Sequence, residues 1–150
     1  MSNSYTSLFV HVIFSTHKRE RVLVTKLRDR LWAYMGGIAR DNKIKPVSLG
    51  GMMDHAHMLI SISPVMPVAK AVQLIKAGSS KWLHENFSAL RNFAWQEGYA
   101  AFTIGAPQVD ELSKYIACQE EHHRVRSFQE EYLSYLKEYG VEYDERYVWG

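Results

Sequence analysis

The sequence predicts a single α+β domain, and three observations support this prediction. The chain has 150 residues, of which 47% are hydrophobic, enough to bury one core. Short runs rich in Val, Ile and Phe alternate with segments whose apolar residues recur every three to four positions, as strands and amphipathic helices do. The order of these segments is strand, helix, strand, strand, helix, strand.

A strand and a helix are expected at the beginning of the chain. Residues 8–15 form an apolar, β-branched run that is typical of a strand. Apolar residues then recur at helical spacing after Thr25, a residue type favoured at the N-cap, until about Asp41. The change of period predicts a buried strand followed by an amphipathic helix.

Two further strands are expected at residues 44–49 and 52–62. Gly50 and Gly51 lie between them and can supply the positive φ angles of a tight turn. The two strands are therefore predicted to pair as a hairpin.

A second helix and a fourth strand follow. Pro67 suits the first turn of a helix, and apolar residues recur at helical spacing from Val68 to Leu83. Residues 93–104 contain the fourth strand. The order β-α-β-β-α-β is that of a ferredoxin-like (RRM-like) fold, in which an antiparallel sheet carries helices packed on one face.

Two C-terminal helices are expected after this unit. Asp110 can cap the first, which contains both Tyr115 and Gln119. Residues 127–150 are predicted to form a last helix, which begins at a Ser-x-x-Glu capping box, and a short aromatic tail. Because no low-complexity linker interrupts the chain, residues 1–150 are expected to form one domain.

Charge is distributed unevenly along the chain. Residues 1–114 hold 14 Lys and Arg against 8 Asp and Glu, whereas residues 115–150 hold 4 against 8. A basic body suits a polyanionic partner, although a solvated surface of mixed sign gives the same count. The single cysteine excludes an internal disulfide, and no apolar run is long enough for a membrane span, so a cytoplasmic protein without membrane association is expected.

Two pairs of residues indicate chemistry. His55 and His57 lie two apart on a predicted strand, so their imidazoles share one face of the sheet and can bind one metal ion. Tyr115 and Gln119 lie four apart and share one helix face, which would bring a nucleophile and an amide ligand together. A tyrosine with an ordinary pKa of about 10 needs a nearby cation to react at neutral pH, and a bound metal would provide it.

Four segments in order along the chain carry a family resemblance: residues 54–59 (Asp-His-Ala-His-Met-Leu), 75–81, 95–99 and 115–119. Together they resemble the single-tyrosine HUH transposases of small bacterial insertion sequences, which are TnpA-like proteins and include the repeat-associated tyrosine transposases. The resemblance spans roughly residues 8–123. The small Ala56 between the histidines departs from the family pattern, and the acidic segment after Gln119 receives no role from it.

The resemblance implies a DNA transposase that cleaves and rejoins single-stranded DNA at hairpin-marked ends through a metal-assisted 5′-phosphotyrosine intermediate. His55, His57 and Gln119 would bind the divalent ion, Mg²⁺ or Mn²⁺, and Tyr115 would be the nucleophile. It also implies a homodimer in which the helix of Tyr115 serves the histidines of the partner chain. The expected location is the bacterial or archaeal cytoplasm, in association with the nucleoid.

Basic and small hydroxyl side chains are candidates for phosphate contacts, because they let a DNA backbone approach closely. An ordinary charged helix face explains the same residues equally well. The candidates are Lys18, Arg19, Arg21, Lys76, Ser79, Ser80 and Lys81.

Three alternative functions stay open. A domesticated relative would nick or bind hairpin repeats without mobilising an element. A ferredoxin-like RNA-binding module would need aromatic residues on its central strands, and residues 8–14 and 55–62 do not supply that pattern. A metal-dependent hydrolase would use activated water and would not need Tyr115.

Overall fold

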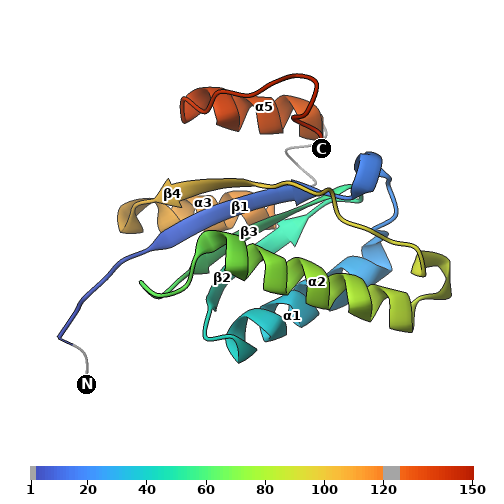
Figure 1. Ribbon diagram of the computed structural model, residues 1–150, viewed down its shortest axis with the longest axis horizontal. Helices are drawn as coiled ribbons and strands as arrows, with labels where there is room; N and C mark the ends of the chain where they lie inside the picture. Colours follow the sequence, from blue (N-terminus) through green and yellow to red (C-terminus); the bar gives the residue numbers. More distant parts are fainter. Residues whose placement is uncertain (1–2, 120–125) are drawn as a thin grey trace.

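The computed structural model describes residues 3–119 and 126–150 and confirms the predicted α+β fold. Four strands form one antiparallel sheet in the order β2-β3-β1-β4, which is the order of the split β-α-β arrangement (Figure 1). The strands are β1 (Phe9–Ser15), β2 (Lys45–Gly51), β3 (His55–Ser61) and β4 (Ala100–Ile104).

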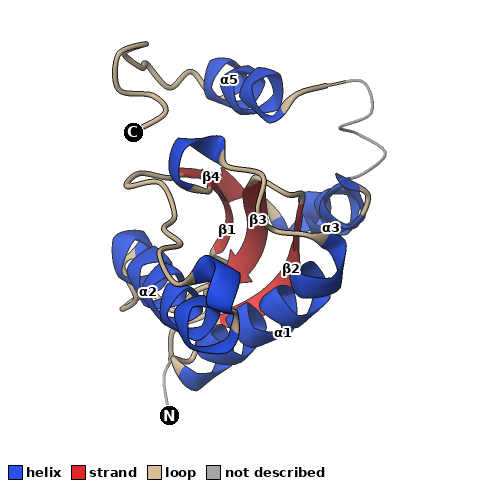
Figure 2. Ribbon diagram, turned by 90° about the vertical axis from the view of Figure 1, so that its right-hand side faces the viewer, coloured by secondary structure: helices blue, strands red, loops and turns tan. Residues whose placement is uncertain are grey.

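Helices cover both faces of the sheet (Figures 1 and 2). The pair α1 and α2 lies on one face, and α3 and α5 lie on the other. The bounds are α1 (Thr25–Asp41), α2 (Val68–Asn86), α3 (Val109–Ala117) and α5 (Phe128–Glu138). Within the described residues, no helix is both long and apolar enough to cross a bilayer.

The main core lies between the sheet and the pair α1 and α2. Alternate residues of β1 and β3 point into it, because side chains of a strand alternate between the two faces. Those of β1 are Val10, Val12 and Phe14, and those of β3 are Ala56, Met58 and Ile60. All six side chains are buried, so this layer makes a large hydrophobic contribution to folding.

The other residues of β1 and β3 face the second layer, which α3 and α5 share. Ile116 of α3 packs near Leu59 of β3. Apolar residues of α5 pack over β1 and β4, with Phe128 in the same cluster as Ile13 and Phe102. The histidines of β1 and β3 lie on this face, and the antiparallel register pairs His57 with Ile13 and His55 with Ser15.

The hairpin between β2 and β3 forms as predicted, but its turn lies elsewhere. Strand β2 continues through Gly51, and residues 52–54 make the turn, so the prediction of Gly50 and Gly51 as a two-residue turn is wrong. Gly51 does have a positive φ, 156°, and an added Cβ would lie 2.2 Å from the His55 carbonyl oxygen, so this position requires glycine. Gly50 is needed for a different reason, since Ile116 of α3 packs directly against its backbone.

Of the three predicted N-cap residues, only one caps its helix. Ser127 caps α5 as predicted, because its Oγ accepts the Glu130 backbone N–H at 3.1 Å. The predictions for Thr25 and Asp110 are wrong. Thr25 is the first helical residue of α1, and Asp110 lies in the first turn of α3, where its carboxylate still complements the helix dipole.

Replacing Gly50 by Ala is expected to displace α3 from the sheet. The new Cβ would lie 2.5 Å from the Ile116 carbonyl oxygen, a backbone atom that cannot rotate away. Such overpacking costs about 1–3 kcal/mol of unfolding free energy, which thermal or urea unfolding measures. Gly37→Ala is the matched control, because its Cβ meets nothing within 4 Å on α1. Equal stability of the two variants would contradict the proposed packing.

Candidate active site

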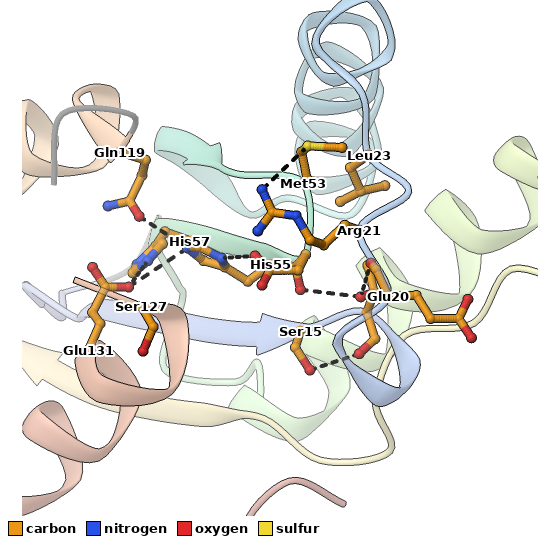
Figure 3. Close-up of polar contacts among 12 residues, drawn as sticks. Ser15, Glu20, Arg21, Leu23, Met53, His55, His57, Gln119, Ser127 and Glu131 are labelled. Atoms are coloured by element: carbon orange, nitrogen blue, oxygen red, sulfur yellow. Dashed lines mark hydrogen bonds and ion pairs between the residues drawn. The ribbon is translucent and has the colours of Figure 1, made fainter. Parts of the chain in front are cut away.

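His55 and His57 lie side by side on β3, and both are fully buried. Each ring is held through its Nδ1 atom. His55 Nδ1 donates to Asp54 Oδ1 at 2.8 Å, and His57 Nδ1 lies 2.9 Å from His11 Nε2. Both rings therefore turn their Nε2 atoms toward the same space (Figure 3).

Gln119 reaches this space from the end of α3. The predicted continuous helix is interrupted, because Cys118 has φ −108° and ψ 33° and its N–H bonds to the Tyr115 carbonyl. Gln119 follows this tight turn, is buried, and places Oε1 3.1 Å from His55 Nε2. Its Nε2 donates to the Tyr115 carbonyl at 3.4 Å, which orients the amide oxygen toward the histidine.

A carboxylate that we did not predict completes the group. Glu131 of α5 is 1% exposed, and its Oε1 lies 2.8 Å from His57 Nε2 and 3.7 Å from His55 Nε2 (Figure 3). A signal for it exists in the sequence, because Glu131 falls on the apolar stripe formed by Phe128, Tyr132 and Tyr135. A charged residue on the buried side of an amphipathic helix requires a polar partner, and the histidines provide it.

Tyr115 is connected to the same carboxylate. Its hydroxyl donates a hydrogen bond to Glu131 Oε2, and its ring lies with its centroid 6.2 Å from that of His57. Burial raises the pKa of Tyr115 well above its ordinary value, and the hydrogen bond to Glu131 and the charge of that carboxylate raise it further. The phenol is therefore protonated at neutral pH, and any reaction at its oxygen would require this proton to leave.

The donor set fits a divalent ion. His55 Nε2, His57 Nε2 and a carboxylate oxygen of Glu131 lie within 4.8 Å of one another, and Gln119 Oε1 adds a fourth ligand atom. An octahedral shell of about 2.1 Å radius places neighbouring ligand atoms about 3 Å apart. The pair His57 Nε2 and Glu131 Oε1, at 2.8 Å, and the pair His55 Nε2 and Gln119 Oε1, at 3.1 Å, are close to this separation. Imidazole nitrogens with amide and carboxylate oxygens suit Mn²⁺ and tolerate Mg²⁺.

Comparisons with known proteins identify the family of this chain. The family model described as "Transposase IS200 like" matches residues 4–119. The chain belongs to the IS200-like transposase family. Two relatives are the ISDra2 transposase TnpA of Deinococcus radiodurans, which is 25% identical over 73% of this chain and 81% of its own length, and the IS200 transposase of Salmonella typhimurium, 27% identical over 63% and 66%.

Solved structures share the fold of this IS200-like transposase. A proposed transposase of Deinococcus radiodurans R1 superposes with a TM-score of 0.67 and 25% identity, covering 79% of this chain and 95% of that one. A REP-associated tyrosine transposase bound to a REP hairpin gives a TM-score of 0.53 at 15% identity, covering 77% and 70%. The family match ends at residue 119, so α5 and Glu131 lie outside it.

In this transposase Asp54 accepts a hydrogen bond from His55 and lies near the positive charge of Arg21. Burial acts to raise the pKa of Asp54, but the hydrogen bond and charge of His55 and the charge of Arg21 outweigh burial and hold the pKa below its ordinary value. Asp54 is therefore ionised at neutral pH. An ionised carboxylate at Nδ1 keeps the proton there and directs the lone pair of His55 Nε2 toward the candidate metal site.

The first group of predicted DNA contacts lies at the same end of the sheet as His55. The segment of Lys18, Arg19 and Arg21 follows the end of β1, and the Arg21 side chain approaches Met53 in the turn before β3 (Figure 3). Lys18 and Arg21 are exposed, and Arg19 stacks its guanidinium 5.1 Å from the Trp149 ring centroid. The DNA contacts of this group stay a prediction.

The second group lies on α2, across the sheet from the histidines (Figure 2). The Lys76 ammonium donates to the carbonyls of Gln96 and Gly98, and Ser79 is buried and bonded to the Ile75 carbonyl. The Lys76 and Ser79 side chains are therefore engaged in hydrogen bonds within the protein. Ser80 is half-buried and Lys81 is exposed, so Lys81 is the most accessible of the four. Contact with DNA stays a prediction for this group too.

The alternative of an RNA-binding module finds no support in the sheet surface. Such modules stack bases on exposed aromatic residues of the central strands. Here α3 and α5 cover that face, and His11, Ile13, His57 and Leu59 at its centre are buried.

Proposed function

We propose that this transposase cleaves and rejoins single-stranded DNA by covalent catalysis, with Tyr115 as the nucleophile and a divalent ion held by His55, His57, Gln119 and Glu131. One observation carries the proposal. Glu131 accepts a hydrogen bond from the Tyr115 hydroxyl at one oxygen, and its other oxygen lies 2.8 Å from His57 Nε2, so the proposed nucleophile and ligand atoms meet at a single carboxylate.

The covalent step follows from this arrangement. Tyr115 Oη forms a bond to the phosphorus atom of a phosphodiester while the bond to the 3′-oxygen breaks. The phenol proton passes to Glu131 Oε2, which already accepts it in a hydrogen bond. The departing 3′-oxygen takes up a proton and becomes a free hydroxyl. The 5′-phosphate remains on Tyr115, and attack by a 3′-hydroxyl on this linkage rejoins the strand.

A bound Mg²⁺ or Mn²⁺ would polarise the phosphodiester and offset the negative charge that develops at phosphorus. Hydrogen bonds orient two of the proposed ligands so that their lone pairs face the ion: Asp54 orients His55, and the Tyr115 carbonyl orients Gln119. Glu131 adds a negative charge to an otherwise neutral ligand set of two imidazoles and an amide. This charge strengthens the attraction for a divalent ion in a buried site.

The proposed substrate is a single strand that carries a hairpin. Cleavage at hairpin-marked ends is what the family resemblance implies, and the REP-associated tyrosine transposase that shares the fold is bound to a REP hairpin. A scissile phosphate must reach a site between α3 and α5, which a flexible strand does more readily than a stiff duplex. The net positive charge of residues 1–114 favours binding of the phosphate backbone.

The proposed homodimer would supply the two nucleophiles that excision of an element requires. In this single chain, Tyr115 lies beside its own His57, and α3 packs against its own β2 at Gly50. A complete site can therefore form within one chain. Exchange of α3 between two chains stays a prediction.

Incubating the protein with a labelled, hairpin-bearing single strand and Mg²⁺ or Mn²⁺ tests the proposed function. We expect a covalent protein–DNA adduct that resists denaturation. Chelation of the metal by EDTA should abolish it, because the phosphodiester is no longer polarised. His57→Ala should reduce it by about a hundredfold or more, since loss of an ion clamp on a transferring phosphoryl group has effects of this size. Adduct formation that is insensitive to EDTA would overturn the metal assignment.

A further inference from the structure

His11 is a fully buried polar residue that the proposed ligand set does not include. It lies on β1, its Nε2 is 2.9 Å from His57 Nδ1, and the two rings stack with centroids 5.1 Å apart. Its other neighbours are aromatic rings, Phe102 at 6.4 Å and Tyr135 at 5.2 Å between centroids. Among the described residues, its Nδ1 has no hydrogen-bond partner.

This environment does not favour a histidine for packing alone. A buried polar ring that leaves one nitrogen unsatisfied stabilises the fold less than an apolar side chain of similar size. The hydrogen bond that His11 makes is the one to His57. The contact with His57 is therefore the physical reason for an imidazole at this position.

The contact with His11 affects which ring nitrogen of His57 carries the proton. A neutral imidazole carries one proton, and Nε2 can offer its lone pair to an ion only if that proton lies on Nδ1. A buried N–H in turn requires an acceptor. For His55 the acceptor is the Asp54 carboxylate, and for His57 the atom in the equivalent place is His11 Nε2.

Resting on the proposed function, we infer that His11 is a positioning residue of the metal site, which accepts the Nδ1 proton of His57 and so keeps Nε2 of His57 available to the ion. The two ligand histidines then differ in character. His55 is supported by a charged carboxylate and His57 by a neutral ring, which fixes orientation without adding charge.

A calorimetric titration of the protein with Mn²⁺ alone tests this inference without DNA. His11→Leu should weaken Mn²⁺ binding about 10- to 100-fold, the usual effect of removing a partner of a ligand histidine. His11→Gln should stay close to the wild type, because its amide oxygen can accept the same proton. Phe102→Leu is the packing control: Phe102 contacts His11 but no proposed ligand, so Mn²⁺ affinity should not change.

Nitrogen-15 NMR of the Mg²⁺-loaded wild type reads the proton directly and does not depend on a variant folding. We expect the His57 proton on Nδ1; finding it on Nε2 would overturn the inference. A His11→Leu variant that binds Mn²⁺ like the wild type, or a His11→Gln variant as weak as His11→Leu, would also overturn it. These results leave the proposed function intact, whereas a wild type that binds no Mn²⁺ removes both.

Discussion

Replacing Tyr115 by Phe should abolish the covalent protein–DNA adduct while hairpin binding stays near the wild-type level. Only the attacking oxygen is removed, and loss of a nucleophile lowers turnover by at least about a thousandfold. The adduct is measured on denaturing gels and binding by mobility shift. Tyr132→Phe is the matched control, because Tyr132 is buried on α5 within the apolar cluster over β1 and β4.

Strand cleavage that persists in the Tyr115→Phe variant would contradict this assignment and favour the metal-dependent hydrolase. The same variant tests how the site is assembled. When it is mixed with a His57→Ala chain, restored activity would show that one chain supplies Tyr115 to the histidines of the other. An inactive mixture, with heterodimers shown to form, would place each site within one chain, as the packing of α3 on its own sheet would allow.

Replacing Glu131 by Gln should weaken Mn²⁺ binding and slow adduct formation together. The amide keeps the size of the side chain but loses the negative charge, and it cannot accept the phenol proton as a carboxylate does. Removal of a general base usually costs about 10²–10⁴ in rate, measured as single-turnover adduct formation. Calorimetry measures the loss of metal affinity.

Glu131→Gln should also lower the pKa of Tyr115, because the hydrogen bond to Glu131 and its charge are among the causes that raise it. The Cζ chemical shift of Tyr115, followed by carbon-13 NMR at rising pH, measures this change for the one residue. Glu130→Gln is a close control: Glu130 is the neighbouring exposed residue, and Gln preserves the capping box with Ser127. Faster adduct formation in Glu131→Gln would show instead that this carboxylate obstructs the site.

The fold could be predicted largely from local patterns. The split order of strands and helices follows from where the apolar period changes, and alternation along β1 and β3 indicates which of their residues face the core. The turn after Gly51 was placed wrongly, because two adjacent glycines are the usual signal of a two-residue turn. Here they serve close packing against His55 and Ile116, a tertiary requirement that no local pattern shows.

The site could be predicted only in part, for a related reason. His55, His57, Tyr115 and Gln119 carry recognisable spacings, and the structure brings these four side chains together. Their catalytic and ligand roles stay predictions. Glu131 has no such spacing, since it lies 74 residues from His57 and meets it only through the packing of α5 on the sheet. His11 meets His57 only because β1 pairs with β3, whereas Asp54 bonds to the adjacent His55.

Under the proposed mechanism, the position of Glu131 far beyond His55 and His57 in the sequence determines when, during synthesis, the protein can first cleave DNA efficiently. Chains emerge from the ribosome N-terminus first, so the sheet with His55 and His57 can form while α5 is still being made. A chain that ends at Gln119 would contain the proposed nucleophile and three of the proposed ligands, but not the carboxylate that accepts the hydrogen bond of the phenol. Under the proposed mechanism, nascent or truncated chains would therefore break DNA strands about 10²–10⁴ times more slowly than the full chain, and cleavage would reach its full rate only when α5 docks.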